Sequence, residues 1–375
     1  MNVIVKKAYD WIVVGSGLYG SVFADAAKRA GKKVLVLEKR AFAGGNIRCK
    51  MYNGVLMHCY GAHIFHTDRK DIWDFVNERA ALQRVHHSPV AVDADGVAFP
   101  LPFNMYTFAQ LWGVSSPSQA REVIAAQRAV EEAALNGRKP KSLEEQALIL
   151  VGRDVFEKFI RSYTEKQWGR SCAELPPDII RRIPIRMTFD GSYFDDPYVG
   201  VPPQGYNPLV SDLLDGVEVR TGIDWLNCEK EYADMAENIL FTGCIDEYYH
   251  HCLGRLDYRS LAFRTKIRDL EKSQGCSVVN WMSADVPYTR TIEHNFFNPD
   301  GYHEEIVVSE EYPMPYTGKN EPYYPVVDDK NLALYEKYRD ISNGKVVFGG
   351  RLGLFRYLDM DEAIASALAL ARDIF

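Results

Sequence analysis

Two histidines, His63 and His66, lie three positions apart in the segment CYGAHIFHT, which spans residues 59–67 and also contains Cys59. Residues of these types at this spacing could bind a metal ion, could exchange protons as an acid/base pair, or could line a pocket for another group. A metal site would also need a carboxylate at a fitting geometry, and only Asp68 is immediately nearby. The choice among the three roles therefore depends on the surrounding segments.

A glycine-rich turn, GSGLYG, contains a second set of residues with a chemical role. Gly15 permits a tight turn, Gly17 lets the backbone approach a pyrophosphate at a helix N-terminus, and Gly20 lets that helix pack on the preceding strand. Glu38 lies 18 positions after Gly20, where a carboxylate can accept from a ribose 2'-hydroxyl and disfavours a 2'-phosphate. The pattern predicts dinucleotide binding.

Three later segments narrow the choice of dinucleotide. GGN (44–46) is a second glycine turn, NILFTG (238–243) is an apolar strand ending in Thr-Gly, and the segment from Lys345 is a strand, a glycine turn and a helix with an acidic start. All three resemble flavoprotein elements, and their order favours FAD over NAD. The sequence contains no second GxGxxG unit for a nicotinamide, so we expect an external reductant for the flavin.

Four arginines gather in the segment 169–186, which contains a glycine, a Pro-Pro pair and a further proline, and which we expect to be a loop. The arginines could form a solvated face or a lid that closes over phosphate. One arginine about 4 Å from a phosphate gains roughly 4 kcal/mol, whereas ordering a loop costs about 1 to 2 kcal/mol per residue. A lid would therefore need several donors and an anchor such as Trp168. The four are Arg170, Arg181, Arg182 and Arg186.

PYTR (287–290) and EPYYPV (321–326) place Arg290, Tyr323 and Tyr324 near the ends of predicted strands. Tyrosine packing would explain these phenols by composition alone. A pocket that combines hydroxyl groups with arginine would instead suit a diphosphate ester.

The overall composition limits the class of protein. The chain has 375 residues, a net charge of -7 and seven cysteines without Cys-x-x-Cys spacing, which argues against a disulfide framework, a zinc site and a generic nucleic-acid surface. No signal segment and no run of 18 apolar residues is evident. We expect a cytoplasmic protein without membrane insertion.

The elements that must position these residues indicate an α/β fold. Residues 10–40 read as strand, helix and strand, residues 103–183 as helices, and residues 245–324 as short alternating strands. Within 154–168 most apolar residues should form a core, although Phe159 or Tyr163 at its rim could stack on a base, which is worth about 1–3 kcal/mol. The predicted parts are a Rossmann-like FAD-binding domain (1–78, 206–244 and 326–375), an inserted helical domain (102–184) with a mobile substrate loop (about 168–183), and an antiparallel sheet domain (79–101, 185–205 and 245–325).

The whole chain resembles the prokaryotic UDP-galactopyranose mutases, through motifs that run in the family order. The resemblance implies interconversion of UDP-galactopyranose and UDP-galactofuranose for galactofuranose-containing glycans, with reduced FAD presenting N5 as the nucleophile to the anomeric carbon and UDP as the leaving group. The motifs are GGN, YGAHIFHTD, LPFNMYTF, LEEQA, YTEKQWGRS, ELPPDIIRRIPIRMTFDGSYF, PYTRTIEH, EPYYPV and FGGRLGLFRYLDM.

The resemblance also implies residue roles. Arg182 and Arg290 would bind the diphosphate, Trp168 would cover the sugar, and His63 would face the flavin as a pocket residue, with no metal. The implied catalytic residues are Arg182, Arg290, His63, Glu311 and Asp359. The implied substrate-binding residues are Phe159, Tyr163, Thr164, Trp168, Arg182, Tyr193, Arg290, Tyr324 and Tyr357. The implied FAD-binding residues are Gly15, Ser16, Gly17, Gly20, Glu38, Lys39, Gly45, Asn46, His63, Ile64, Gly243, Gly350, Arg351, Tyr357, Leu358 and Asp359.

Several alternatives stay open at this point. One-residue shifts are possible at Arg181/Arg182, Tyr323/Tyr324 and Glu310/Glu311, and related mutases act on UDP-N-acetylgalactosamine or dTDP-fucose. An amine-oxidase-like FAD oxidoreductase and a flavin-binding sensor without activity are the competing functions. A homodimer is expected from relatives.

Overall fold

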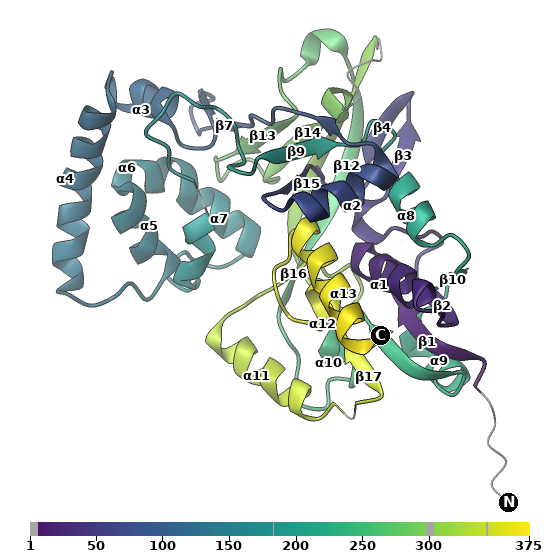
Figure 1. The fold of residues 1–375 in the computed structure, drawn as a ribbon. Coiled ribbons are helices and arrows are strands. Elements are labelled where there is room, and N and C mark those ends of the chain that lie inside the picture. Colours follow the sequence, from purple (N-terminus) through teal and green to yellow (C-terminus); the bar gives the residue numbers. More distant parts are fainter. Residues whose placement is uncertain (1–6, 183, 298–303, 343) are drawn as a thin grey trace, which may run out of the picture.

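The computed structural model describes residues 7–182, 184–297, 304–342 and 344–375, although not the side chains of Arg181 and Arg182. Figure 1 shows a helical part, α3 to α7, that stands beside a strand-rich part and a nucleotide-binding part. Within the described chain, no helix is long and apolar enough to cross a membrane.

A five-stranded parallel sheet forms the nucleotide-binding part. Its strand order is β10-β2-β1-β11-β17, and the crossover from β1 to β2 through α1 is the predicted strand-helix-strand unit. Parallel strands buried on both faces need apolar side chains throughout, as in the VLVLE sequence of β2. The strands are β1 (Tyr9–Val14), β2 (Val34–Glu38), β10 (Glu218–Thr221), β11 (Ala236–Phe241) and β17 (Val346–Phe348).

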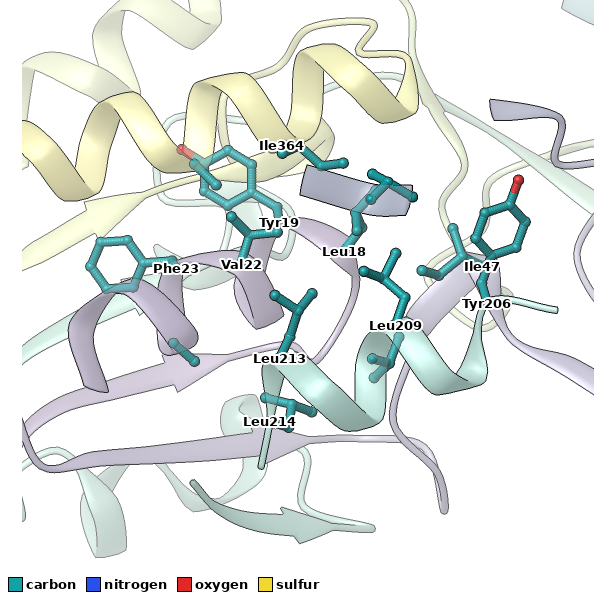
Figure 2. Close-up of a cluster of buried hydrophobic side chains, with 14 of the residues drawn as sticks. Leu18, Tyr19, Val22, Phe23, Ile47, Tyr206, Leu209, Leu213, Leu214 and Ile364 are labelled. Atoms are coloured by element: carbon teal, nitrogen blue, oxygen red, sulfur yellow. The ribbon is translucent and has the colours of Figure 1, made fainter. Parts of the chain in front are cut away.

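Helices cover both faces of this sheet. On one face the apolar side of α1 packs between α8 and α13, and Figure 2 shows Leu18 and Val22 of α1 between Leu213 of α8 and Ile364 of α13. On the other face Trp225 of α9 packs into a second core. This placement fixes the N-terminus of α1 at the carboxyl edge of the sheet. The helices are α1 (Leu18–Arg29), α8 (Asn207–Leu213), α9 (Trp225–Tyr232) and α13 (Met360–Ile374).

A seven-stranded sheet carries the second set of candidate residues. Its order is β16-β12-β15-β14-β13-β7-β8, and five of its six pairings are antiparallel, as predicted. The sixth pairing, β13 with β7, is parallel and joins two strands from distant parts of the chain. The strands are β7 (Val90–Val92), β8 (Ala98–Pro100), β12 (Tyr258–Asp269), β13 (Val278–Trp281), β14 (Arg290–Glu293), β15 (Glu305–Pro315) and β16 (Tyr324–Pro325).

Three helices of the helical part have a side-chain cap at the N-terminus. Asn104, Ser116 and Ser142 each accept a hydrogen bond from a backbone N–H in the following first turn. The predicted single helix over 154–168 is instead interrupted by a π-helical turn, Phe156–Ile160. The α-helices are α3 (Met105–Trp112), α4 (Pro117–Leu135), α5 (Leu143–Val151), α6 (Arg153–Val155) and α7 (Arg161–Trp168).

Three sets of contacts cross the predicted domain boundaries. Strand β5 (Phe65–Thr67), which we placed in the nucleotide-binding part, pairs with β9 (Tyr198–Val201), which also pairs with β6 (Gln83–Arg84). Helix α10 (Ile245–Tyr248), which we placed in the sheet domain, packs with α11 (Asp329–Asp340) as well as with Tyr258 of β12. The helical core also includes Phe99 of β8 and Met282, which directly follows β13, so residues 102–184 share their core with the sheet. The division into three domains stays a prediction.

The remaining elements complete the frame around the candidate site. They are η1 (Gly45–Ile47), β3 (Cys49–Tyr52), β4 (Val55–His58), α2 (Lys70–Ala80), η3 (Pro177–Arg182), η4 (Leu270–Lys272), η5 (His294–Phe297) and α12 (Gly350–Gly353).

Candidate active site

Glycines at the end of β1 bring three backbone segments into close contact. A Cβ on Gly20 would lie 2.0 Å from the carbonyl oxygen of Gly15, so α1 can pack on β1 only without one. Gly45 has φ +54, and a Cβ there would lie 2.8 Å from the Cα of Gly17. The two glycine turns therefore touch, as a site built from backbone requires.

Glu38 is buried beside the first turn. Its Oε2 accepts from the backbone N–H of Ser16 at 3.0 Å and from the Ser16 hydroxyl at 2.7 Å. Arg40 donates to Asn46 Oδ1 at 3.0 Å and to Glu321 Oε2 at 3.0 Å, and Lys39 Nζ pairs with the same Glu321 oxygen at 3.1 Å. These contacts fix the carboxylate of Glu38 and the second glycine turn in one cluster.

The C-terminal glycine segment joins the same place. A Cβ on Gly15 would lie 2.1 Å from Thr242 Oγ1, and one on Gly350 would lie 3.5 Å from Thr242 Cβ and 3.6 Å from Tyr19 Cβ. Gly243 follows Thr242 directly. The three segments that the sequence separates by about 100 to 200 residues therefore converge at the N-terminus of α1.

The N-terminus of α1 fits the pyrophosphate of a dinucleotide. Within the described chain, no side chain caps this helix and its first turn contains no acidic residue. Its leading N–H groups are therefore available as donors, and Gly17 leaves open the approach to them. The backbone cradle, the free donors and the buried carboxylate of Glu38 all suit the group that the sequence predicts.

Arg290 and Glu311 form a partly buried ion pair in the seven-stranded sheet. Arg290 Nε lies 3.1 Å from Glu311 Oε1, and the Glu311 side chain is only 3% exposed, whereas that of Arg290 is 27% exposed. Burial acts to lower the pKa of the Arg290 guanidinium, but Glu311 and the surrounding phenols raise it well above its usual range. Arg290 is therefore a permanent cation whose terminal nitrogens can serve a second anion.

Four phenols surround this cation. Tyr163, Tyr193, Tyr324 and Tyr357 all have pKa values raised by burial, and the charge of Arg290 acts on each of them. Tyr357 is nevertheless 39% exposed. Tyr357 therefore opens this cluster to solvent. The phenols stay protonated and can donate to an anion that binds there.

The phenol cluster is continuous with the glycine segments. Tyr324 and Tyr357 stack with their ring centroids 5.8 Å apart, and the Arg351 guanidinium lies over the Tyr324 ring at 5.2 Å. Arg351 directly follows Gly350, and Tyr357 precedes Leu358 and the N-cap residue Asp359 of α13. The predicted cofactor and substrate residues therefore meet at the segment 350–359.

His63 lies between the two sets of residues as a neutral side chain. Burial lowers its pKa to about 4, with Arg351 and Arg290 acting in the same direction against the bond to Gly61. Its Nδ1 lies 2.8 Å from the carbonyl oxygen of Gly61, which can only accept, so Nδ1 holds the proton and Nε2 is left as an acceptor. A Cβ on Gly61 would lie 3.6 Å from Glu311 Oε2, which places this segment beside the ion pair.

His66 lies apart from His63. Its Nδ1 is 2.7 Å from Asp196 Oδ2, and its ring stacks on Phe194 with centroids 3.9 Å apart. Among the described residues, no group of three or more His, Cys, Asp or Glu side chains could hold a metal ion. The two histidines therefore have different partners in this structure, and the role of His63 as a pocket residue stays a prediction.

Two of the four loop arginines already have partners. Arg170 pairs with Asp257 at 2.7 Å and Asp328 at 3.0 Å, and Arg186 bonds to Asp195 Oδ1. Arg170 and Arg186 are therefore ion-paired, which corrects the expectation that all four arginines form one unpaired cationic cluster. Arg182 falls in η3, but its side chain lies outside the described part of the chain.

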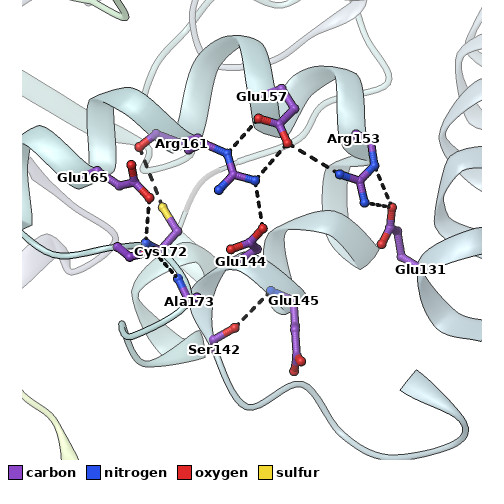
Figure 3. A network of polar contacts seen from close by, with 11 residues as sticks. Glu131, Ser142, Glu144, Glu145, Arg153, Glu157, Arg161, Glu165, Cys172 and Ala173 are labelled. Atoms are coloured by element: carbon purple, nitrogen blue, oxygen red, sulfur yellow. Dashed lines mark hydrogen bonds and ion pairs between the residues drawn. The ribbon is translucent and has the colours of Figure 1, made fainter. Parts of the chain in front are cut away.

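The start of the predicted loop is tied to the helical part. The backbone N–H of the buried Cys172 donates to Glu165 Oε1 at 3.0 Å, and its thiol donates to the carbonyl of Arg161. Figure 3 shows these bonds beside the ion pairs of Arg161 with Glu157 and Glu144. In this conformation the segment is packed, and its movement stays a prediction.

Some predicted residues lie outside the Arg290 cluster. Phe159 is 2% exposed and packs against Phe99 and Phe103 at 4.9 and 5.5 Å, so its ring is a core residue here and has no free face for a base. Thr164 is buried, and Trp168 packs on the helical core. Ile64 is also a core residue.

The structure distinguishes two of the ambiguous neighbours. Glu310 points to the other face of β15, where it pairs with Lys266 Nζ at 2.5 Å, whereas Glu311 pairs with Arg290. Tyr323 is buried against Phe263, whereas Tyr324 lies under Arg351. Alternation along β15 sends Glu310 and Glu311 to opposite faces, so only Glu311 joins the cluster, whereas Tyr323 lies behind Tyr324 with their ring centroids 6.1 Å apart.

Three residues near the site were not among the predicted site residues, namely Arg40, Tyr60 and Lys166. Arg40 lies over the Tyr60 ring at 4.4 Å, and Lys166 inserts into the loop before β14. Their partners are distant in sequence, and a single sequence contains no local signal for such contacts.

The buried histidines predict acid sensitivity of the fold. Burial lowers the pKa values of His87 and His294 to about 3, whereas an unfolded histidine titrates near 6.5. The unfolded chain therefore binds more protons between pH 6.5 and 4, and the free energy of unfolding falls as pH falls through this window. We expect roughly 1 to 2 kcal/mol lost per fully buried histidine at pH 5, measured by urea unfolding at pH 7.5 and 5.0.

The matched variants for this measurement are His294→Gln and His250→Gln. Substitution of the buried His294 should weaken the pH dependence of the free energy of unfolding. Substitution of the exposed His250 should leave that dependence unchanged. Equal unfolding free energies of the wild type at the two pH values would contradict the assignment.

The fold and site together define a Rossmann-type dinucleotide-binding protein with a cationic, phenol-lined cluster beside its glycine turns. A family model described as UDP-galactopyranose mutase matches residues 158–357, and one for NAD(P)-binding Rossmann-like domains matches residues 13–79. A probable UDP-galactopyranose mutase of Klebsiella pneumoniae is 36% identical over 365 residues, which cover 96% of this chain and 93% of that protein. The chain therefore belongs to the UDP-galactopyranose mutase family.

Two further comparisons refine this result. A dTDP-fucopyranose mutase of Escherichia coli is 33% identical and covers 96% of this chain, which spans 97% of that protein. A crystal structure of reduced UDP-galactopyranose mutase superposes with a TM-score of 0.73 at 14% identity, covering 98% of this chain and 93% of that one, and shows the shared fold. The protein is an enzyme of the isomerase class, and the family and the Rossmann-like domain indicate a flavin cofactor.

Proposed function

We propose that this enzyme interconverts UDP-galactopyranose and UDP-galactofuranose with FAD as its cofactor in the reduced state. The observation that supports it best is the Arg290–Glu311 pair, surrounded by four protonated phenols and adjoining the glycine segments. Such a site can hold a diphosphate as a leaving group without offering a side-chain nucleophile of its own.

The cofactor residues divide by the part of FAD that they suit. The N-terminus of α1 with Gly17 and Gly45 suits the pyrophosphate, and Glu38 suits a ribose hydroxyl because an acid disfavours a 2'-phosphate. Arg351 and the N-cap residue Asp359 lie toward the phenol cluster and suit the flavin side. When bound and reduced, the flavin supplies an electron-rich nitrogen that can attack the anomeric carbon.

The chain's own groups hold the leaving nucleotide. Arg290 offers its terminal guanidinium nitrogens, while Tyr324 and Tyr357 offer hydroxyl donors in the same cluster. A guanidinium and two phenols can bind the departing diphosphate and return it for the reverse reaction. Neutral His63, with Nε2 as an acceptor, can orient a hydroxyl of the sugar without adding charge.

A mutase for dTDP-fucopyranose is the second candidate, because the Escherichia coli relative is nearly as similar as the Klebsiella one. The experiment is to assay the dithionite-reduced enzyme with UDP-galactofuranose and dTDP-fucofuranose, and to identify the flavin released on heating. The proposal expects FAD and a kcat/KM at least tenfold higher for the UDP sugar. The opposite preference would assign the second function, and release of FMN alone would contradict the cofactor.

Arg182→Ala is expected to lower kcat/KM at least tenfold while retaining FAD, because the resemblance places this guanidinium on the diphosphate. The change is measured by steady-state kinetics with reduced enzyme. Arg181→Ala, its neighbour in η3, is the matched control and should retain activity within about threefold. The reverse pattern would move the role to Arg181.

The external reductant, the homodimer and the cytoplasmic location remain predictions. Reduction by added NAD(P)H-dependent flavin reductase, sedimentation of the purified enzyme and fractionation of cells would test the three in turn.

A further inference from the structure

Lys166 extends from α7 into a ring of backbone carbonyls. Its Nζ lies 2.7 Å from the oxygen of Trp281, 2.8 Å from that of Ser283, 3.0 Å from that of Val286 and 3.2 Å from that of Tyr288. All four carbonyls belong to the segment 281–288, which joins β13 to β14. One side chain therefore contacts this loop at four points.

The chemistry of this contact requires a cation. An ammonium group has three protons, so four convergent oxygens must share them, and the attraction is that of a charge for four dipoles. Within the described chain, Lys166 has no carboxylate partner. Burial lowers its pKa to about 8, so the group is still mostly protonated at neutral pH. Without the cation, the negative ends of four carbonyls would face one another.

The loop that Lys166 holds leads directly into the candidate site. Arg290 is the first residue of β14, two positions after the Tyr288 carbonyl, and Thr289 between them donates to Glu311. Tyr163 lies one helical turn before Lys166 and donates to Asn280 Oδ1 at 3.3 Å on the same hairpin. Helix α7 thus contacts both sides of the turn that presents Arg290.

We infer that Lys166 is a positioning residue that sets the place of the Arg290 guanidinium relative to the phenols of the site by holding the 281–288 loop. It acts through the main chain and does not touch the diphosphate. This inference rests on the proposed role of Arg290 in binding the diphosphate of a nucleotide sugar. It also explains how a helix from one part and a strand from another contribute to one cluster.

Lys158 provides a matched control on the same helical run. Its Nζ lies 2.6 Å from Asp93 Oδ2, next to β7, so it also bridges the helices to the sheet, but it does not contact the hairpin of Arg290. Loss of either lysine should lower the melting temperature. Only the loss of Lys166 should weaken the binding of a diphosphate.

The test is calorimetric titration of the oxidised, flavin-bound enzyme with UDP, which requires no turnover. Lys166→Met should weaken UDP binding about tenfold or more, whereas Lys158→Met should leave it within twofold of the wild type. In an Arg290→Ala background, Lys166→Met should add less than a further twofold, because its effect is exerted through Arg290.

Lys166→Arg is a second variant that tests the inference if Lys166→Met does not fold. A planar guanidinium retains the charge but cannot direct its N–H groups at four oxygens that converge on one point, so we expect about three- to tenfold weaker UDP binding. UDP affinity within twofold of the wild type in the folded Lys166 variants, or full additivity with Arg290→Ala, would overturn the inference. If the wild type binds neither UDP nor dTDP, the proposed function itself fails.

Discussion

Arg290→Ala is expected to lower kcat/KM at least 100-fold while the enzyme keeps its FAD. The guanidinium is the permanent cation of the phenol cluster, and a charge-assisted bond to a diphosphate strengthens as the leaving group gains charge. Flavin retention is expected because Arg290 belongs to the seven-stranded sheet, whereas the glycine turns that suit the pyrophosphate follow strands of the five-stranded sheet. Steady-state kinetics of the reduced enzyme and the ratio of flavin to protein absorbance measure the two quantities.

This substitution also strands the buried Glu311, which could cost about 3–5 kcal/mol of stability by itself. The double variant Arg290→Ala/Glu311→Gln removes the unpaired charge and separates the two causes. We expect it to regain thermal stability but not activity. Arg264→Ala, an exposed arginine that lies over Tyr312 on the other strand face, should retain wild-type kinetics. Recovery of activity in the double variant would show that Arg290 serves only to neutralise Glu311.

Gly45→Ala is expected to reduce the bound flavin at least tenfold. The added methyl carbon would lie 2.8 Å from the Cα of Gly17, and neither backbone can move without disturbing the cradle for the pyrophosphate. The left-handed φ of +54 adds roughly 1–2 kcal/mol of strain for an alanine. Flavin content after reconstitution with excess FAD, measured by absorbance, gives the result.

Gly96→Ala separates strain from steric conflict. Gly96 has φ +78, but nothing lies within 4 Å of an added Cβ, so this variant bears the same conformational cost in open space. It should bind FAD normally. Full flavin occupancy in Gly45→Ala would mean that the two glycine turns do not form the cofactor cradle.

The nucleotide-binding part was predictable because its signals are local. Gly15, Gly17 and Gly20 lie within one turn, and Glu38 ends the next strand, so the fold class and the family resemblance are both confirmed. Residues 10–40 also form the strand, helix and strand that the sequence predicts. The assignment of individual site residues stays a prediction, although the structure gathers most of them into one cluster.

The differences arise where the partner of a residue is distant in the chain. Arg170 is neutralised by Asp257 and Asp328, and Lys166 is held by carbonyls more than 110 positions away, contacts that no spacing rule can indicate. Phe159 shares a period with Tyr163 in sequence, but the π-helical turn and the packing of Phe99 place it in the core. The parallel pairing of β13 with β7 likewise cannot be predicted from the alternation of apolar and polar residues in either strand.

The most direct test asks whether turnover depends on the redox state of the flavin, although the reaction oxidises neither the flavin nor the sugar. The enzyme is incubated anaerobically with UDP-galactofuranose in the oxidised and in the dithionite-reduced state, and the sugar nucleotides are separated by chromatography. We predict conversion to UDP-galactopyranose by the reduced enzyme alone, over many turnovers and with the flavin still reduced at the end. Flavin reduction by the substrate itself, or equal conversion by the oxidised enzyme, would contradict the proposed mechanism.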